Sequence, residues 1–152
     1  MKKTELQVSA LENGTVIDHI SHGVVLQVVK LLGLEDCEER IYMGANLDSQ
    51  KYGKKGIIKV ANRYFKAEEI NKIALISPYA SIIEIRDFEV VKKSIVSIPD
   101  EIKGIVKCMN PNCITNKETI ETRFTVNKAE GELKLKCHFC EKNTVQSSIE
   151  FI

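Results

Sequence analysis

Two closely spaced cysteine pairs near the end of the chain constrain its fold more than any other feature. Four residues separate Cys108 from Cys113, and two separate Cys137 from Cys140. Short loops of this kind direct two thiolates to one point, and zinc binds four such ligands in a tetrahedron. Four thiolates also leave no coordination position for water or a substrate. We therefore predict one structural zinc ion per chain, held by all four cysteines.

Two disulfides, or four unrelated thiols, are the competing interpretation of these cysteines. The chain has five cysteines, an odd number, and its first residues lack the apolar core of a signal peptide. Both observations favour metal over disulfides. The cysteine-bearing segment is also too short to fold on apolar burial alone, so a bound ion would supply the missing free energy. Cys37 lies among acidic residues, which should raise its pKa, and we expect no reactive thiol there.

Charge and hydropathy argue against two classes of protein, those that bind nucleic acid and those that span a membrane. The 152 residues include 22 lysines and arginines against 21 acidic residues, and no apolar stretch approaches the ~18 residues of a membrane helix. The balance holds on both sides of residue 100, so neither part resembles a basic, nucleic-acid-binding domain. We expect a cytoplasmic protein that binds neither membrane nor nucleic acid.

Upstream of the cysteines, short β runs alternate with two helical stretches. The expected helices are 23–32, for which the valines make a strand the alternative, and 67–77, which stops before Pro78. The β runs are 6–11, 15–20, 40–47, 56–62, 80–85 and 88–96. This order matches a ferredoxin-like fold with an added hairpin strand. The predicted class is α+β, with an open antiparallel sheet and two helices on one face.

A break at residues 97–101, which include Pro99, separates this domain from the cysteine-bearing segment. We place domains at 1–98 and 103–152. The second domain is predicted to be a small all-β zinc ribbon with strands at 105–107, 121–127, 132–137 and 144–152.

No phosphate-binding loop, dinucleotide fingerprint or nucleophile elbow is present in the sequence. The polar cluster of Asp18, His19 and His22 follows a predicted strand and has three interpretations. It is a solvent-exposed strand end, a ligand site or an acid/base pair, in decreasing order of preference. On its own it supports no function.

Several segments together resemble the regulatory chain of aspartate carbamoyltransferase, over essentially the whole length. They are 13–20 (NGTVIDHI), 43–47 (MGANL), 55–60 (KGIIKV), 88–93 (FEVVKK) and the two cysteine pairs. The resemblance implies a non-catalytic subunit of pyrimidine biosynthesis, whose first domain binds the allosteric effectors ATP and CTP. Its zinc domain would dock on the catalytic chain. The implied assembly joins two catalytic trimers through three regulatory homodimers.

Carried over by position, the resemblance implies roles for nine residues at the nucleotide. Ala10, Leu11 and Val90 would flank the base, Asp18 and Lys59 would approach the ribose and base, and His19 and Lys93 would face the triphosphate. Ile83 and Phe88 stand where the family commonly has an amide and a tyrosine, so the effector preference is in question. Candidate docking residues on the cysteine loops are Asn110, Asn112 and Glu141.

Two other functions remain alternatives at this point. A zinc ribbon can bind nucleic acid, but the tail here is nearly neutral and holds only Phe124, Phe139 and Phe151 as aromatic residues. A small enzyme could use Asp18 and His19 as acid and base, and turnover of a nucleotide by the isolated chain would support it.

Overall fold

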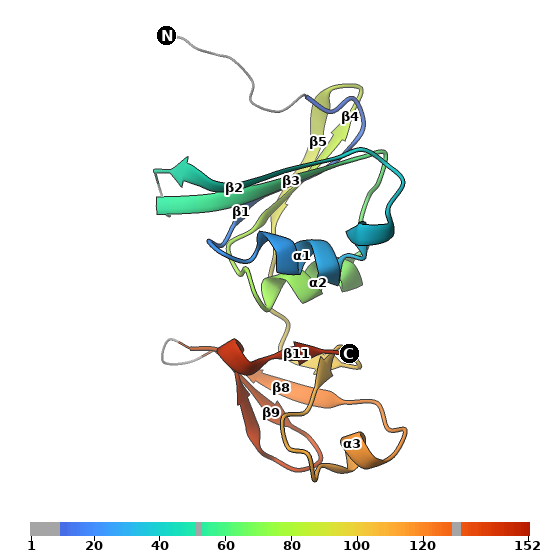
Figure 1. The fold of residues 1–152 in the computed structure, drawn as a ribbon, viewed down its shortest axis with the longest axis vertical. Coiled ribbons are helices and arrows are strands. Elements are labelled where there is room, and N and C mark those ends of the chain that lie inside the picture. The colour runs from blue at the N-terminus through green and yellow to red at the C-terminus, as the bar shows by residue number, and fades with distance from the viewer. Residues whose placement is uncertain (1–9, 51–52, 129–131) are drawn as a thin grey trace. The chain divides into compact units, whose positions relative to one another are not determined.

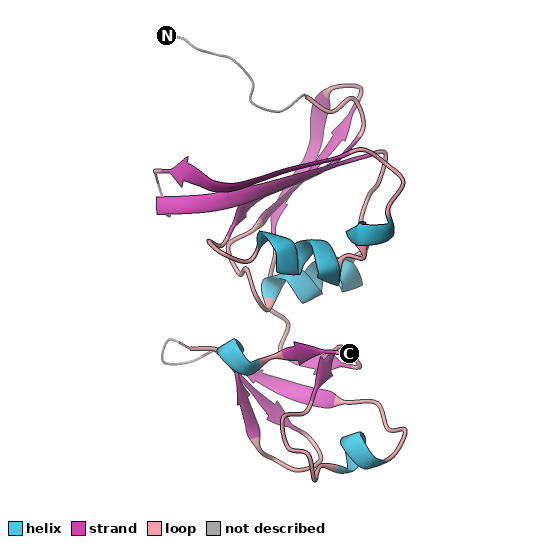
Figure 2. Cartoon of the chain, viewed as in Figure 1, coloured by secondary structure: helices cyan, strands magenta, loops and turns pink. Residues whose placement is uncertain are grey.

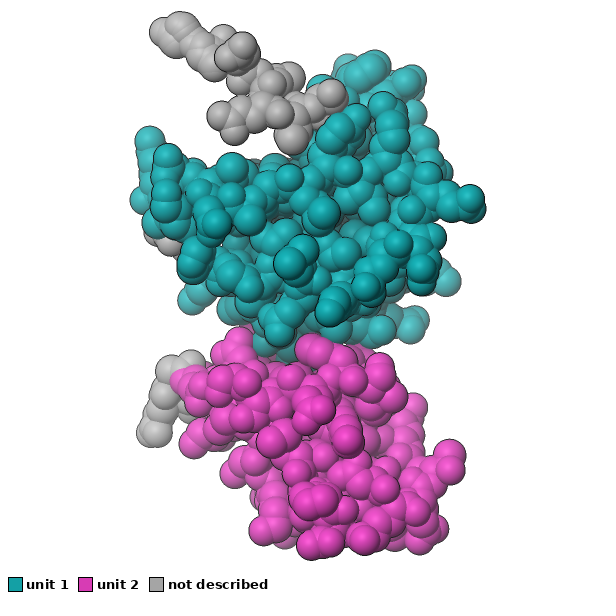
Figure 3. Space-filling view, viewed as in Figure 1, with its two compact units in different colours: residues 1–97 teal, residues 98–152 magenta. Residues whose placement is uncertain are grey.

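The structure is a computed structural model that describes residues 10–50, 53–128 and 132–152. The chain divides into two compact units, Met1–Ser97 (unit 1) and Ile98–Ile152 (unit 2), coloured separately in Figure 3. Each unit has a sheet and a buried apolar core of its own. Among the helices of the described residues, none is long and apolar enough to cross a membrane.

Unit 1 contains a five-stranded antiparallel sheet in the order β2-β3-β1-β4-β5. Its strands are β1 (Gly14–Ile20), β2 (Ile41–Ser49), β3 (Gly53–Ala61), β4 (Ser81–Arg86) and β5 (Glu89–Ile95). The first four strands have the ferredoxin-like order, and β5 extends the sheet beyond β4. The predicted fold class is confirmed.

Both helices of unit 1, α1 (Val25–Leu31) and α2 (Ala67–Ala74), lie on one face of the sheet (Figure 1). The short 3-10 turn η1 (Leu34–Asp36) follows α1. Val25 and Val28 of α1 are buried, so the valines form the buried side of a helix and the strand alternative is wrong. Gly33 follows the helix in the left-handed conformation, which glycine adopts at no steric cost. At the start of α2, the Glu69 carboxylate accepts a hydrogen bond from the backbone N–H of Lys66.

Three β-bulges, in β1, β2 and β5, decide which side chains face away from the helices, and the one in β2 lies between Gly44 and Leu47. In β1, Ile17 pairs with Ile58 and Ile20 with Gly56, so Asp18 and His19 together oppose one residue of β3. His19 takes up the extra residue with a φ of 55°. A second irregularity in β5 follows from Ile85 pairing with Val90 and Glu84 with Lys92. Because a bulge shifts the alternation of side chains by one residue, each changes the residues that share a face.

Unit 2 is a small β structure whose four-stranded sheet has the order β10-β9-β8-β6 (Figure 2). Its central strands alternate strictly between buried and exposed residues, and Phe124 and Leu135 are fully buried. The elements in chain order are β6 (Glu101–Lys103), β7 (Val106–Lys107), α3 (Ile114–Lys117), β8 (Arg123–Asn127), β9 (Lys134–Cys137), β10 (Asn143–Val145), η2 (Gln146–Ser148) and β11 (Glu150–Phe151). Strand β11 pairs separately with β7.

Four details differ from the expected elements. Strand β6 starts at Glu101, inside the segment predicted as the linker, and the short helix α3 was not predicted. The run 144–152 is not one strand, because the turn η2 divides it into β10 and β11. The first predicted run falls at residues 6–9 outside the described residues, and Ala10 and Leu11 belong to no strand.

Candidate metal centre and ligand-binding face

The four predicted ligands meet at one end of unit 2. Cys108 follows β7, Cys113 is the residue before α3, Cys137 ends β9, and Cys140 lies in the turn that leads to β10. Their four sulfur atoms lie within 4.8 Å of one another, and no other such group of metal ligands occurs among the described residues.

The sulfur positions fit a zinc ion. Sγ of Cys108 is 3.6 Å from Sγ of Cys140, and Sγ of Cys113 is 3.7 Å from Sγ of Cys137. A tetrahedron with zinc–sulfur distances of about 2.3 Å has edges of about 3.8 Å. A disulfide would instead need sulfurs ~2.05 Å apart, so the disulfide interpretation does not fit. Four thiolates make the centre structural, and zinc is the metal that this ligand set favours.

Electrostatics at the four sulfurs explains why a cation is needed. Burial raises the pKa of the Cys108 thiol to about 12, and burial also raises the pKa of Cys137. Burial also favours a higher pKa for Cys140. Hydrogen bonds, foremost those from the Lys142 backbone and the Asn110 side chain, outweigh the effect of burial and lower the pKa of Cys140 to about 7. Thiolates buried together are costly without a compensating charge, and a divalent cation supplies that charge.

Hydrogen bonds within the two cysteine loops fix the positions of the ligands. The Asn116 side-chain amide donates to the carbonyl oxygens of Cys108 and Asn110, at 3.0 and 2.7 Å. In the second loop, the backbone N–H of Glu141 donates to the carbonyl of Cys137, with Glu141 in the left-handed conformation. Both loops are thus ordered by contacts that do not involve the metal.

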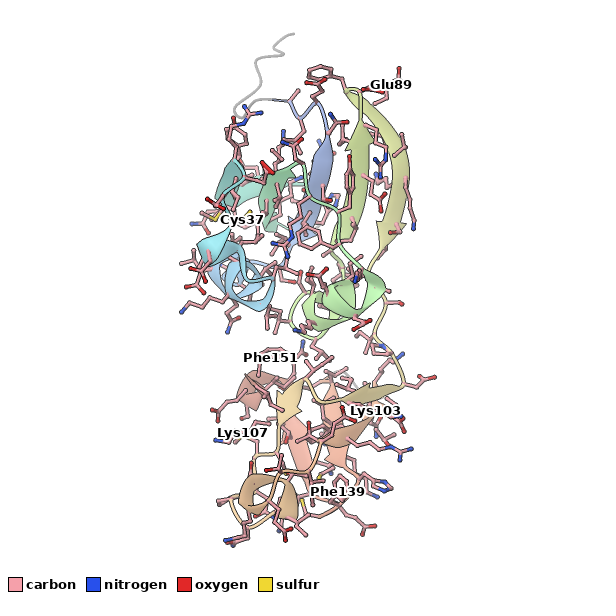
Figure 4. The ribbon with its side chains drawn as sticks, turned by 90° about the vertical axis from the view of Figure 1, so that its right-hand side faces the viewer. Cys37, Glu89, Lys103, Lys107, Phe139 and Phe151 are labelled. Atoms are coloured by element: carbon pink, nitrogen blue, oxygen red, sulfur yellow. The ribbon has the colours of Figure 1, made fainter. Side chains whose placement is uncertain are left out.

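The three candidate docking residues surround the metal centre. Asn112 and Glu141 are exposed, and Asn110 is half-buried because its side chain also bonds the Asn112 N–H. Sequence reasoning missed three exposed apolar residues on the same loops and on α3, namely Met109, Ile114 and Phe139. Figure 4 shows Phe139 projecting at the end of unit 2 that carries α3. Apolar residues at ligand-loop tips cannot be recognised as exposed until the loops are placed.

The outer face of the unit 1 sheet, opposite the helices, carries a row of side chains that crosses all five strands. Lys59 of β3 pairs with Tyr42 of β2 and with Val16 of β1. Ile83 of β4 pairs with Val16 and with Lys93 of β5. Directly paired residues share a face of a sheet. The row therefore presents two lysines on either side of an apolar centre.

Asp18 and the residues around it form the polar end of this face. The Lys55 ammonium lies 2.8 Å from the Asp18 carboxylate, with both side chains about four-fifths buried. The backbone N–H of His19 donates to the same carboxylate at 2.7 Å, and His19 Nδ1 lies 3.3 Å from Oγ of Ser81. Burial alone would raise the pKa of Asp18, but the hydrogen bonds from Lys55 and His19 lower it. The Asp18 carboxylate is therefore ionised and is held in place by these two contacts.

The other end of the face is apolar. Leu11 packs with Val16 and Ala61 in a buried cluster, against which half-buried residues pack, namely Tyr42, Ile57, Ile83 and Ile85. Val90 reaches the outer face because the β5 bulge places it on the side of Lys93, three residues away. Ala10, next to Leu11, is exposed.

Phe88 occupies a tight turn beside this apolar cluster. Asp87 and Phe88 both have positive φ, 52° and 66°, between the paired residues Arg86 and Glu89, so they form a type I′ turn. The backbone N–H of Phe88 donates to the carbonyl of Glu12. An aromatic residue rarely adopts this conformation, and its side chain is 65% exposed. Glu89, labelled in Figure 4, marks the start of β5 at this turn.

Sequence reasoning missed Lys55 and Tyr42 as members of the outer face. Lys55 could have been found from alternation alone, since it lies four residues before Lys59 on the same strand. Tyr42 depends on the register between β2 and β3, which the sequence does not specify.

Comparison with known families covers both units. The allosteric domain of the aspartate carbamoyltransferase regulatory chain matches residues 6–97, and the metal-binding domain of the same chain matches residues 100–150. These matches do not favour the nucleic-acid-binding alternative. Among solved structures, the crystal structure of an MjSpt4:Spt5 complex aligns with a TM-score of 0.22 at 12% identity, over 91% of this chain and 97% of that one, which carries no inference.

Curated relatives extend over nearly the same length as this chain. The aspartate carbamoyltransferase regulatory chain of Bacteroides thetaiotaomicron is 51% identical over 99% of this chain and 97% of its own. That of Porphyromonas gingivalis is 47% identical over the whole of both chains, and that of Thermococcus sibiricus is 48% identical over 95% of each. The four-thiolate centre and the two-unit architecture agree with the two matched domains, and this chain belongs to the family of aspartate carbamoyltransferase regulatory chains.

Proposed function

We propose that this regulatory, non-catalytic chain binds ATP and CTP on the outer face of the unit 1 sheet and docks on the aspartate carbamoyltransferase catalytic chain through the loops around its zinc ion. The observation that carries the proposal is the row across the five strands. Its lysines and its apolar centre come from separate strands and share one face.

The chemistry of this face suits a nucleotide. The apolar cluster around Val16 and Ile83 offers a surface for the base, and Ala10, Leu11, Phe88 and Val90 border it. Asp18 is ionised and would accept a hydrogen bond from a ribose hydroxyl. His19 and Lys93 would contact phosphate oxygens, and lysine is a strong point-charge partner for phosphate. Lys59, on the other side of the apolar centre, would approach the ribose and base. In this proposal Ile83 gives the base an apolar contact and no hydrogen bond.

Nucleotide binding can be tested by calorimetric titration of the zinc-loaded chain with CTP and with ATP. We expect saturable binding in the wild type that the double variant Lys59→Ala, Lys93→Ala weakens by at least tenfold. Lys92→Ala is the matched control, because Lys92 pairs with Glu84 and so lies on the opposite face of β5. Equal losses in both variants, or no binding by the wild type, would refute the assignment of the site.

The partner proposal rests on the surface around the metal centre. Exposed apolar side chains of Met109, Ile114 and Phe139 lie among the polar residues Asn110, Asn112 and Glu141. An apolar centre with a polar rim is the usual composition of a protein interface. We propose that the catalytic chain covers this surface and that two catalytic trimers and three regulatory homodimers make up the assembly, which works in the cytoplasm. None of the five cysteines forms a disulfide in the structure, which suits that compartment.

Docking can be tested by mixing the chain with its catalytic partner and measuring the mass of the complex in solution. Phe139→Ser should abolish or weaken the complex, whereas Leu26→Ser, which alters a more exposed apolar residue on α1, should not. A complex of unchanged affinity with Phe139→Ser would exclude this surface.

In the assembly, an effector can shift the balance between two quaternary states only by binding one state more tightly than the other. The zinc ion, when bound, supplies a cross-link between two loops and no catalytic position. The chain's own contribution is to hold the effector on the unit 1 sheet and, within unit 2, to hold the two docking loops around the ion.

A further inference from the structure

A small pocket at the end of β1 is mostly lined by residues that have no role in the function proposed above. It has a volume of about 160 Å³ and is lined by His19, Ile20, Ser21, His22, Lys54 and Tyr79. A single water needs only ~10–15 Å³, so the pocket can hold a group much larger than one water. Of its lining residues, only His19 belongs to the proposed nucleotide set.

The lining supplies hydrogen-bond donors and no carboxylate. Two imidazoles, the Tyr79 phenol and the Lys54 ammonium all have N–H or O–H groups. The backbone of Ser21 is fixed at the pocket by a hydrogen bond from its N–H to Oγ of Ser77, at 2.9 Å. His22 is exposed, and in the described parts of the chain its imidazole has no hydrogen-bond or ion-pair partner.

The two carboxylates near this pocket are each balanced by a lysine. Asp18 bonds Lys55 at 2.8 Å, and Asp48 bonds Lys54 at 2.7 Å. A cation site would need ligand oxygens or deprotonated groups facing inward, which this lining does not provide. The lining instead combines hydrogen-bond donors from two strands and two loops and contains no carboxylate. This composition is typical of a site that binds an anion.

We propose that this pocket binds a phosphate group, with His22 and Tyr79 as hydrogen-bond donors. The Lys54 ammonium, whose charge Asp48 partly offsets, lies beside them. The group has two possible sources, free inorganic phosphate and the terminal phosphate of a nucleotide that lies on the outer face. Only the second source depends on the function proposed above. His19 connects the two regions, because it lines the pocket and also bonds Ser81 beside Asp18.

The histidines allow a direct test, because the chain has only three and the third, His138, lies in unit 2. Nuclear magnetic resonance of the imidazole groups in the zinc-loaded full chain should show the signals of His19 and His22 shifting saturably with added inorganic phosphate. The His138 signal should not move, and chloride at equal ionic strength should shift none of them.

Two variants and two nucleotides distinguish the possible outcomes. Tyr79→Phe, which removes one hydroxyl, and His22→Ala should each weaken phosphate binding by about tenfold, as expected for the loss of one hydrogen bond to a charged group. His138→Ala is the control and should leave it unchanged. The nucleotide supplies the phosphate if CTP shifts the His22 signal, if inorganic phosphate competes with CTP for that shift, and if cytidine shifts neither the His19 nor the His22 signal.

If phosphate moves His22 but CTP does not, the pocket holds a free anion, and this result stands even if the nucleotide proposal fails. Phosphate titrations that leave His22 unmoved, or that Tyr79→Phe and His22→Ala do not weaken, would overturn the pocket proposal. A His22 signal that responds to Zn²⁺ and not to phosphate would overturn it as well. Nucleotide binding with an unperturbed His22 would leave the outer-face site intact and limit the failure to this pocket.

Discussion

Removing the zinc ion should unfold unit 2 and leave unit 1 folded. A structural zinc ion bound to cysteine ligands contributes on the order of 10 kcal/mol at neutral pH, and in small metal-binding domains this contribution is most of the folding free energy. A core of the size available to residues 98–152 supplies at most ~3–5 kcal/mol. Removing the ion also leaves three buried cysteines, Cys108, Cys113 and Cys137, without the cation that they surround, which works against that small core. The metal-free unit should therefore be mostly unfolded at 25 °C. Cys137→Ser should have the same effect, because Cys137 is fully buried between β9 and the second ligand loop.

The distribution of tyrosines makes this prediction measurable. All four tyrosines of the chain, Tyr42, Tyr52, Tyr64 and Tyr79, lie in unit 1. Tyrosine fluorescence and near-ultraviolet circular dichroism therefore report on unit 1, while the His138 resonance reports on unit 2. A strong chelator should collapse the His138 signal to its unfolded position and leave the tyrosine signals unchanged.

Two results would refute this reasoning. A chelated chain that keeps a native His138 resonance would show that hydrogen bonds such as those of Asn116 hold the ligand loops without metal. A simultaneous change in the tyrosine signals would show that the two units do not fold separately. Cys37→Ser is the matched control, because it removes the one cysteine outside the metal centre and should change neither signal.

Three further predictions concern unit 1. The pKa of Asp18 is lowered in the folded chain, so its carboxylate stabilises unit 1 at pH values above the ordinary pKa of 3.8. This contribution is lost as the pH falls through the lowered pKa. In urea unfolding followed by tyrosine fluorescence, Lys55→Met should destabilise unit 1 by about 1 kcal/mol at pH 7, and Asp18→Asn should remove the acid-dependent loss. If Lys55→Met costs nothing, the ion pair contributes nothing to stability. Phe88→Gly should raise the free energy of unfolding by about 0.5–1 kcal/mol, since the left-handed conformation is unfavourable for phenylalanine and the exposed ring loses little burial; a loss of stability in the same assay would show that the ring packs. Gly14→Ala should destabilise unit 1 by about 2–3 kcal/mol, because φ is 144° and the added Cβ would overlap the carbonyl oxygen of Val60; a change below 0.5 kcal/mol, on the order of an ordinary surface substitution, would contradict the close approach.

The metal ligands and the order of elements in unit 1 could be predicted from sequence because each depends on local patterns. Cysteine spacing identifies the ligands, and apolar periodicity with turn residues identifies most strands and both helices. Strand β6 was not predicted because it has only three residues, close to Pro99, which is too few to show an alternation of apolar and polar residues. The break at η2 was missed because Gln146 and Ser148 are common in strand ends as well as turns.

The composition of the outer face could not be predicted from residue patterns alone, because bulges in β1, β2 and β5 set it. Strict alternation would place Val90 and Lys93 on opposite faces, and the pairing irregularity in β5 reverses that. The same applies to Ile17 and Ile20, which are both fully buried although they are three residues apart. Bulges depend on pairing between distant strands, and a single sequence does not contain that register. The roles of Asp18, Lys59 and Lys93 came from family resemblance, and they stay predictions.

The row from Tyr42 to Lys93 has a consequence for the motions of the sheet. β2 and β5 are its edge strands, and edge strands open first in native-state hydrogen exchange. A molecule lying along the row would touch both edges and the three strands between them, although the chain connects these strands in a different order. Binding would then slow amide exchange at β2 and β5 together, two segments some 40 residues apart in sequence. Such a ligand would connect the two edge strands across the sheet, so both would gain protection from amide exchange as one cooperative unit.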